Sequence, residues 1–166
     1  MERQARIINS WGKNIYVKIP VTNTKKKSSA ALIAKLSYEG IRLNVTALLT
    51  LTQVRGVLKA LSPKTFAIIS VFAGRIADTG VDPTPIMKAA KALTKKRKNV
   101  ELLWASPRQL LDIYNAGAAG ADIVTVTPDI LNKLGKIGYD HAAYSLDTVK
   151  MFYEDGRKAG FILHGK

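Results

Sequence analysis

The sequence predicts an α/β fold in which helices connect the strands of a parallel sheet. Five short apolar runs, rich in β-branched and aromatic residues, alternate along the 166-residue chain with segments of helical pattern. This alternation is typical of βα units joined by crossovers. The runs are apolar on both faces, as expected for parallel strands covered by helices. Two layouts fit the pattern: an open doubly wound sheet, or part of a (β/α)8 barrel.

The strand predictions depend on apolar runs that end at turn-forming residues. The predicted strands occupy residues 14–19, 43–49, 66–72, 100–106 and 122–127. None of them is followed by a G-x-G-x-x-G or Walker motif, which counts against a nucleotide-binding sheet. Each strand carries a polar residue near its carboxyl end, the end at which barrel enzymes place their catalytic groups.

The helix predictions depend on apolar periodicity and on terminal residues. The predicted helices occupy residues 1–10, 29–39, 51–61, 84–96, 107–117, 129–137 and 145–161. Gly40 is the predicted C-cap of the second helix. Pro83 or Pro85 lies in the first turn of the fourth helix and Pro107 in that of the fifth, where proline costs no hydrogen bond. Ser145 is the predicted N-cap of the last helix, which carries an apolar stripe. We interpret Asp78 and Asp82, in the loop before the fourth helix, as turn and helix caps.

Lys18 lies in the middle of the first predicted strand, between apolar neighbours. Strand alternation places Ile15, Val17 and Ile19 on one face and Tyr16 with Lys18 on the other. A lysine held there is poorly solvated, and burial favours the neutral amine, which is a nucleophile that forms Schiff bases with carbonyl substrates. The alternative is an ordinary strand lysine that extends to water along its methylene groups. The residues of this strand alone favour the alternative.

Several short motifs follow one another in a fixed order: VKIPVT at 17–22, EGIRLNVT at 39–46, TQ at 52–53, ISVFAGRIAD at 69–78 and WAS at 104–106, followed by Arg108. In this order and spacing they resemble the transaldolase family, which includes the small transaldolases and the fructose 6-phosphate aldolases. The resemblance runs from about Gln4 to about Leu163. The resemblance implies a (β/α)8 barrel whose active-site lysine forms a Schiff base with a ketose phosphate. The family's enzymes transfer a dihydroxyacetone unit between phosphorylated sugars in carbohydrate metabolism, and aldolase activity is a variant of this chemistry.

The resemblance also implies roles for eight residues. The implied Schiff-base nucleophile is Lys18. Thr46 with Asn44 resembles the pair that contacts the sugar and the catalytic water, Ser70 and Phe72 line the pocket, Arg75 binds phosphate, and Ser106 and Arg108 add phosphate contacts. The phenylalanine at position 72 favours transfer over simple aldol cleavage, because the family's aldolases tend to have tyrosine there. The helix expected to begin at Pro107 adds N-terminal amides that favour anions.

The motifs found here correspond to the fourth and later strands of the family barrel. The first three strands, which precede the lysine strand in the family, have no counterpart in this sequence. Those strands carry an aspartate, an asparagine and the glutamate or glutamine that transfers protons. We therefore expect an N-terminally truncated barrel of about five βα units with a C-terminal helix, in one domain over residues 1–166. Five parallel strands leave two open edges that are prone to association. The chain is interpreted as a fragment, or as one that needs another polypeptide to close its barrel; a catalytically impaired sugar-phosphate binder is the alternative.

Composition limits the partners. The formal net charge of +14 favours anionic partners. The dense basic clusters at 25–27 and 95–98 are interpreted as solvated surface, and a basic nucleic-acid-binding domain is the rival from another class. No helix-turn-helix, RNP-like strand or zinc knuckle supports that rival. We expect phosphorylated sugars as substrates, no nucleic-acid or membrane partner, and a homo-oligomer formed through the C-terminal helix or the barrel edges.

No cofactor and no metal are expected. The sequence has no cysteine, and His141 and His164 do not have the spacing of metal ligands. The N-terminal segment lacks the apolar core of a signal peptide, and no run approaches the about 20 apolar residues of a membrane span. A cytoplasmic location is therefore expected.

Overall fold

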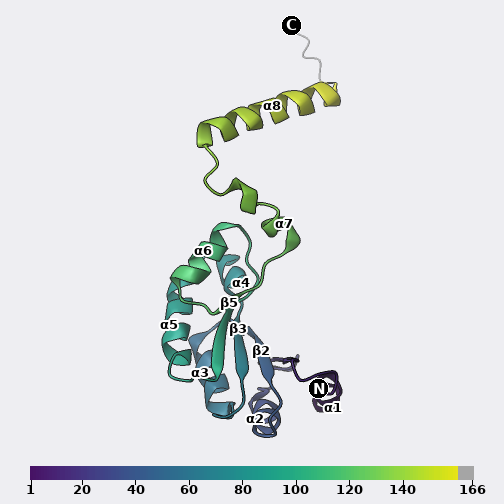
Figure 1. Ribbon diagram of the computed structural model, residues 1–166, viewed down its shortest axis with the longest axis vertical. Helices are drawn as coiled ribbons and strands as arrows, with labels where there is room; N and C mark the ends of the chain where they lie inside the picture. The colour runs from purple at the N-terminus through teal and green to yellow at the C-terminus, as the bar shows by residue number, and fades with distance from the viewer. Residues whose placement is uncertain (161–166) are drawn as a thin grey trace. The chain divides into compact units, whose positions relative to one another are not determined.

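The computed structural model describes residues 1–160 and divides the chain into two compact units (Figure 1). The first unit is Met1–Leu131 and the second is Asn132–Lys166, of which residues 132–160 are described. Each unit is treated by itself, and the single domain expected over 1–166 stays a prediction. Residue 161, the end of the predicted last helix, and His164 lie outside the described residues.

The first unit contains five strands and seven helices. The strands are β1 (Val17–Pro20), β2 (Leu43–Leu48), β3 (Ala67–Val71), β4 (Val100–Trp104) and β5 (Ile123–Val124). The helices are α1 (Glu2–Asn9), α2 (Ala30–Tyr38), α3 (Leu51–Ala60), α4 (Ala73–Ala77), α5 (Thr84–Thr94), α6 (Leu111–Ala118) and α7 (Pro128–Leu131). All five predicted strands are therefore confirmed in place.

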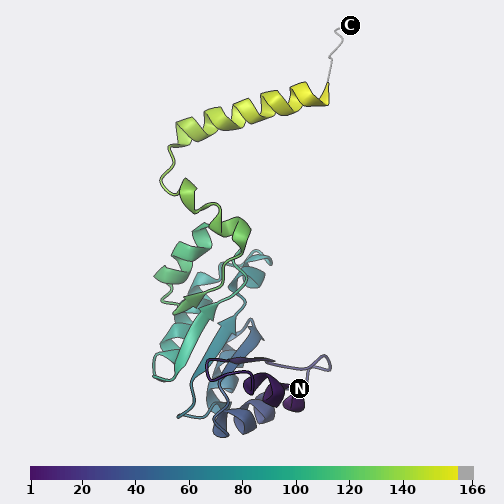
Figure 2. The same ribbon diagram turned by 45° about the vertical axis from the view of Figure 1, so that its right-hand side comes forward.

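The strands form one parallel sheet in the order β1-β2-β3-β4-β5, which is also their order along the chain (Figure 2). A doubly wound sheet reverses its strand order at a switch point, whereas a barrel adds each strand beside the previous one. The consecutive order therefore decides between the two predicted layouts in favour of part of a barrel. Helix α2 packs on α3, α3 on α5 and α5 on α6, so the crossover helices form one continuous layer.

The two faces of the sheet differ in burial. One face contributes the core against the helix layer, with side chains such as Val17, Val45, Ile69 and Leu102 buried. The other face carries a row of residues paired in register across four strands: Lys18, Asn44, Ile68 and Glu101. Lys18 and Glu101 are exposed, while Asn44 and Ile68 are half-buried. This second face corresponds to the interior of a closed barrel.

Some boundaries differ from the sequence predictions for identifiable reasons. Helix α6 begins at Leu111 instead of 107, because the Asp112 carboxylate accepts hydrogen bonds from the backbone N–H groups of Arg108 (2.6 Å) and Gln109 (3.3 Å) and holds that stretch as a turn. Strand β5 has two residues, and the preceding Asp122 uses its side chain to accept the N–H of Leu102 at 2.8 Å. Helix α4 lies where a loop was expected.

The second unit contains a short 3-10 helix, η1 (Leu134–Lys136), and the long helix α8 (His141–Ala159). The N-cap of α8 is Asp140, whose carboxylate accepts the N–H of Ala143 at 2.8 Å, so the predicted N-cap Ser145 is wrong and lies inside the helix. None of the residues of α8 is buried, and its apolar stripe is exposed: Leu146, Val149, Phe152 and Tyr153. Among the described residues, no helix combines the length and apolar character that crossing a membrane requires.

Candidate functional site

Lys18 lies near the middle of β1 on the sheet face that the helix layer does not cover. Its neighbours Val17 and Ile19 are 1% and 3% exposed and point into the core, whereas Lys18 itself is exposed. The expectation of a poorly solvated lysine is therefore wrong for this chain. The physical reason is that β1 is an edge strand, so its outer edge and the face around Lys18 are open.

Asn44 and Ser70 continue the site along the sheet from Lys18. Asn44 is the residue on β2 paired with Lys18. The Ser70 hydroxyl donates a hydrogen bond to Asn44 Oδ1 at 2.7 Å, and Ser70 is only 1% exposed. That bond occupies the Asn44 oxygen and fixes the plane of its amide beside the lysine. The structure therefore brings these three predicted residues together on three neighbouring strands.

Thr46 lies two residues beyond Asn44, on the same face of β2. It is 9% exposed, and its Oγ1 is buried without a hydrogen-bond partner among the described residues. A buried hydroxyl without a partner is costly, and such groups commonly bind a water molecule or a ligand. Ala47 follows with φ of 64°, at a shift of register between β2 and β3. Left-handed backbone at a non-glycine residue is strained, and such residues cluster at functional sites. No feature of the sequence predicts this conformation at Ala47.

Phe72 and Arg75 lie at the carboxyl end of β3. Phe72 is the N-cap of α4, and Arg75 belongs to that short helix. The Arg75 guanidinium carbon lies 5.5 Å from the centre of the Phe72 ring, a cation–π arrangement. Phe72 therefore supports the arginine from one side.

Ser106 lies beside α4, in the loop after β4. A Cβ placed on Gly74 would lie 1.5 Å from the Ser106 carbonyl oxygen, so only glycine fits at this contact. The Gly74 N–H donates to the carbonyl of Ala105 at 3.2 Å, and Ser106 has φ of 59°. The glycine of the G-R-I motif thus holds the ends of β3 and β4 close together.

Arg108 binds Asp78, the residue that ends α4. Its Nε donates to Asp78 Oδ1 at 3.0 Å, and its Nη2 donates to Asp78 Oδ2. The Arg108 guanidinium holds the pKa of the Asp78 carboxyl below its ordinary value. The interpretation of Asp78 as a turn cap is therefore wrong. Asp82 precedes Pro83, the N-cap of α5 (Thr84–Thr94), and accepts the N–H of Thr84 at 2.8 Å.

The amides expected to favour anions near residue 107 are engaged within the chain. The backbone N–H of Arg108 binds the Asp112 carboxylate, and Asp112 is 6% exposed. Sequence reasoning did not single out Asp112. Asp112 lies in the first turn of α6 as it is observed, where acidic residues are favoured, but beyond the first turn of a helix that begins at Pro107.

An apolar groove borders Lys18 on the open edge of the sheet. It encloses about 420 Å³ between α1 and β1, and its lining includes Ile8, Trp11 and Lys18. Trp11 is 71% exposed. The groove was not predicted from the sequence, because the first helix was considered only as the segment that precedes the lysine strand.

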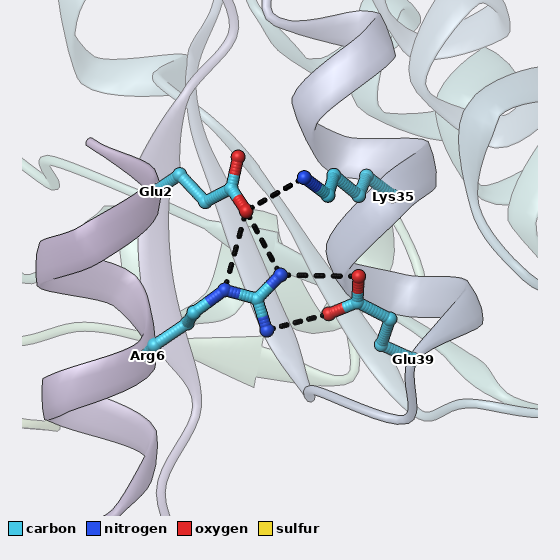
Figure 3. A network of polar contacts seen from close by, with 4 residues as sticks. All are labelled: Glu2, Arg6, Lys35 and Glu39. Atoms are coloured by element: carbon cyan, nitrogen blue, oxygen red, sulfur yellow. Dashed lines mark hydrogen bonds and ion pairs between the residues drawn. The ribbon is translucent and has the colours of Figure 1, made fainter.

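A four-residue ion network holds α1 against α2 (Figure 3). Arg6 binds Glu2 on its own helix at 2.9 Å and Glu39, which follows α2, at 2.7 Å. Lys35 of α2 binds Glu2 at 2.8 Å. Lys35 and Arg6 lower the pKa of Glu2, and Arg6 lowers the pKa of Glu39. Because α1 forms one wall of the groove, this network fixes the groove beside Lys18.

Comparison with known proteins identifies the family. The family described as Transaldolase/Fructose-6-phosphate aldolase matches residues 1–162. "Probable transaldolase 2" of Listeria monocytogenes is 36% identical over 135 residues, which is 81% of this chain and 58% of the relative. "Probable transaldolase" of Nitrosopumilus maritimus is 31% identical over 157 residues (90% and 67%), and that of Thermoanaerobacter sp. is 32% identical over 161 residues (96% and 68%).

The chain belongs to the transaldolase/fructose 6-phosphate aldolase family. It spans about 58% of the length of the Listeria relative. The five consecutive parallel strands are consistent with a truncated form of the family's barrel.

Proposed function

We propose that this chain carries the Schiff-base half of a transaldolase-type site, in which a dihydroxyacetone unit is transferred between phosphorylated sugars. The single observation that carries the proposal is the line of Lys18, Asn44 and Ser70 across three adjacent strands. Arg75 follows the carboxyl end of β3, and Arg108 follows that of β4. Its family membership supports the same chemistry.

The proposed reaction begins at Lys18. The neutral amine attacks the ketose carbonyl, and loss of water gives an iminium ion. The iminium accepts the electron pair of the C3–C4 bond when a base removes the C4 hydroxyl proton, which releases an aldehyde and leaves an enamine on the lysine. The enamine then attacks an acceptor aldehyde, and hydrolysis regenerates the amine. Asn44, held by Ser70, is suited to bind a hydroxyl of the attached unit.

The phosphate group is assigned to Arg75, Ser106 and Arg108. Arginine binds phosphate through paired N–H groups, and anchoring the phosphate brings the carbonyl to the lysine. Thr46 lies two residues beyond Asn44 on the same face of β2. Its hydroxyl, which has no partner in the described residues, is proposed to bind a water that relays protons. Phe72 favours transfer over simple cleavage.

Because Lys18 is exposed, we infer that full turnover requires a further surface that shields this lysine from water. Water has free access to this lysine, and the carboxylate that drives proton transfer in the family is absent from the motifs found here. A polypeptide that pairs with the edge of β1 and lies in the α1–β1 groove would bury Lys18. Sugar-phosphate binding with slow or absent turnover is therefore the second candidate for the chain alone. A homo-oligomer and a cytoplasmic location stay predictions.

The nucleic-acid alternative loses support from Arg97, in the middle of the cluster 95–98. Its guanidinium donates to the carbonyls of Leu58, Leu61 and Ser62 at 3.2, 3.2 and 2.9 Å, so it is a structural cap at the end of α3. Arg97 is thus bound to the protein's own backbone and is not available to contact a nucleic acid.

Borohydride trapping tests the proposal. The chain is incubated with fructose 6-phosphate, reduced, and searched for adducts by peptide mass spectrometry, with Lys18→Arg as the test variant and Lys13→Arg as the matched control. A dihydroxyacetone-derived mass on Lys18 supports Schiff-base formation with cleavage, and a whole-hexose mass supports binding without cleavage. Adduct formation that persists in Lys18→Arg, or its absence from the folded wild-type chain, refutes Lys18 as the nucleophile.

A further inference from the structure

The contact between Arg108 and Asp78 links two elements that carry the candidate phosphate site. Asp78 ends α4, the helix of Arg75, and Arg108 lies 30 residues later in the loop after β4. Both carboxylate oxygens of Asp78 are used, one by Nε and one by Nη2 of Arg108. This two-point geometry fixes the guanidinium plane as well as its distance.

The contact leaves part of Arg108 available. A guanidinium has five N–H donors, and the fork with Asp78 uses one on Nε and one on Nη2. In the described part of the chain, Nη1 makes no hydrogen bond. The terminal edge between Nη1 and Nη2 is the edge that can bind an oxyanion while the Nε edge is held. The main chain of Arg108 is held too, by Asp112.

Asp78 also acts on the second arginine of the site. The charge of Arg75 contributes to the lowered pKa of the Asp78 carboxyl, after the larger contribution of Arg108. The same carboxylate therefore binds one guanidinium group directly and offsets the charge of the other. Without it, the side chain of Arg108 would have to be ordered by the incoming ligand, whereas Arg75 would keep its contact with Phe72.

We propose that Asp78 is a positioning residue, which holds Arg108 and offsets Arg75 so that both can bind a sugar phosphate. This inference rests on the proposed function, because it assigns a role within the same phosphate site. The competing possibility is that Asp78 occupies Arg108 in place of phosphate. Removal of the Asp78 charge would weaken phosphate binding in the first case and strengthen it in the second.

The test is titration of inorganic phosphate into the ¹⁵N-labelled chain at neutral pH, followed through the Nε–H signals of Arg75 and Arg108. The test variant is Asp78→Asn, and the matched control is Asp82→Asn, an exposed cap four residues away. Each variant removes one negative charge, so the change in the net charge of the chain is the same in both. Asp78→Asn is expected to weaken phosphate binding about three- to tenfold, since binding must then immobilise an arginine side chain, and Asp82→Asn to leave it unchanged.

The outcomes separate this inference from the proposed function. If wild type binds phosphate and Asp78→Asn binds it equally or more tightly, the positioning role is refuted while the proposed function stands. If wild type shows no binding, both are refuted. Asp78→Glu retains the charge and is expected to restore part of the affinity together with the Arg108 Nε–H shift. Equal weakening by Asp82→Asn would overturn the inference.

Discussion

Replacing Gly74 with alanine tests how the two parts of the proposed phosphate site are joined. The added Cβ would lie 1.5 Å from the Ser106 carbonyl oxygen, whereas real Cβ contacts are essentially never below 3.0 Å, so α4 and the loop after β4 must separate by about 1.5 Å. The Gly74–Ala105 hydrogen bond, now 3.2 Å long, breaks at that separation. Overpacking costs about 1–3 kcal/mol and a lost hydrogen bond about 1 kcal/mol, so Gly74→Ala is expected to lower the free energy of unfolding by about 2–4 kcal/mol.

Urea unfolding followed by circular dichroism measures this effect. Gly56→Ala is the matched control, because Gly56 lies inside α3 and its added Cβ meets nothing within 4 Å. Alanine is the better helix residue, so the control is expected to gain about 0.5–1 kcal/mol. A Gly74→Ala chain as stable as wild type would refute the claim that this close approach determines the geometry of the site.

Two further predictions concern the surface charges. Arg97→Ala is expected to lower the free energy of unfolding by about 2 kcal/mol, because three backbone carbonyls lose a charged donor, whereas the exposed Lys96→Ala should change it by less than about 0.5 kcal/mol. Equal effects in urea unfolding would contradict the structural role of Arg97. The lowered pKa values of Glu2 and Glu39 mean that the anchorage of α1 is complete above their ordinary value of 4.5 and is lost as the pH falls through the lowered values. Amide exchange in α1, corrected for its intrinsic pH dependence, should therefore accelerate at low pH, and Glu39→Gln should cause the same loosening at neutral pH.

The sequence was sufficient to locate the strands, because each strand is an apolar run between turn residues. The pairing of Lys18 with Asn44 was predictable only in outline. Strand alternation predicted the face of the sheet on which each side chain lies. It did not predict which residue of β2 lies opposite Lys18, because this register is set by the packing of the two strands. The bond from Ser70 to Asn44 then follows, since both side chains lie on the same face of adjacent strands.

The parts that sequence reasoning missed depend on contacts between distant residues. The five-residue helix α4 is too short for apolar periodicity to show. The partner of Arg108 lies 30 residues away, and an aspartate in a loop is more often a cap than an ion-pair partner. The left-handed backbone at Ala47 has no compositional signal, because alanine is not a residue that favours it.

The two halves of the candidate site depend differently on what covers the sheet. The phosphate half is held within the described chain, by the Gly74–Ser106 approach, the Asp78–Arg108 fork and the Asp112 carboxylate. The proposed nucleophile has no such support, since Lys18 stands exposed on an edge strand beside an open groove. Under the proposed function, phosphate binding therefore depends on this chain's own packing, while the reactivity of Lys18 depends on a surface that closes over β1. It follows that a polypeptide that covers the groove should raise adduct formation at Lys18 more than it raises phosphate affinity.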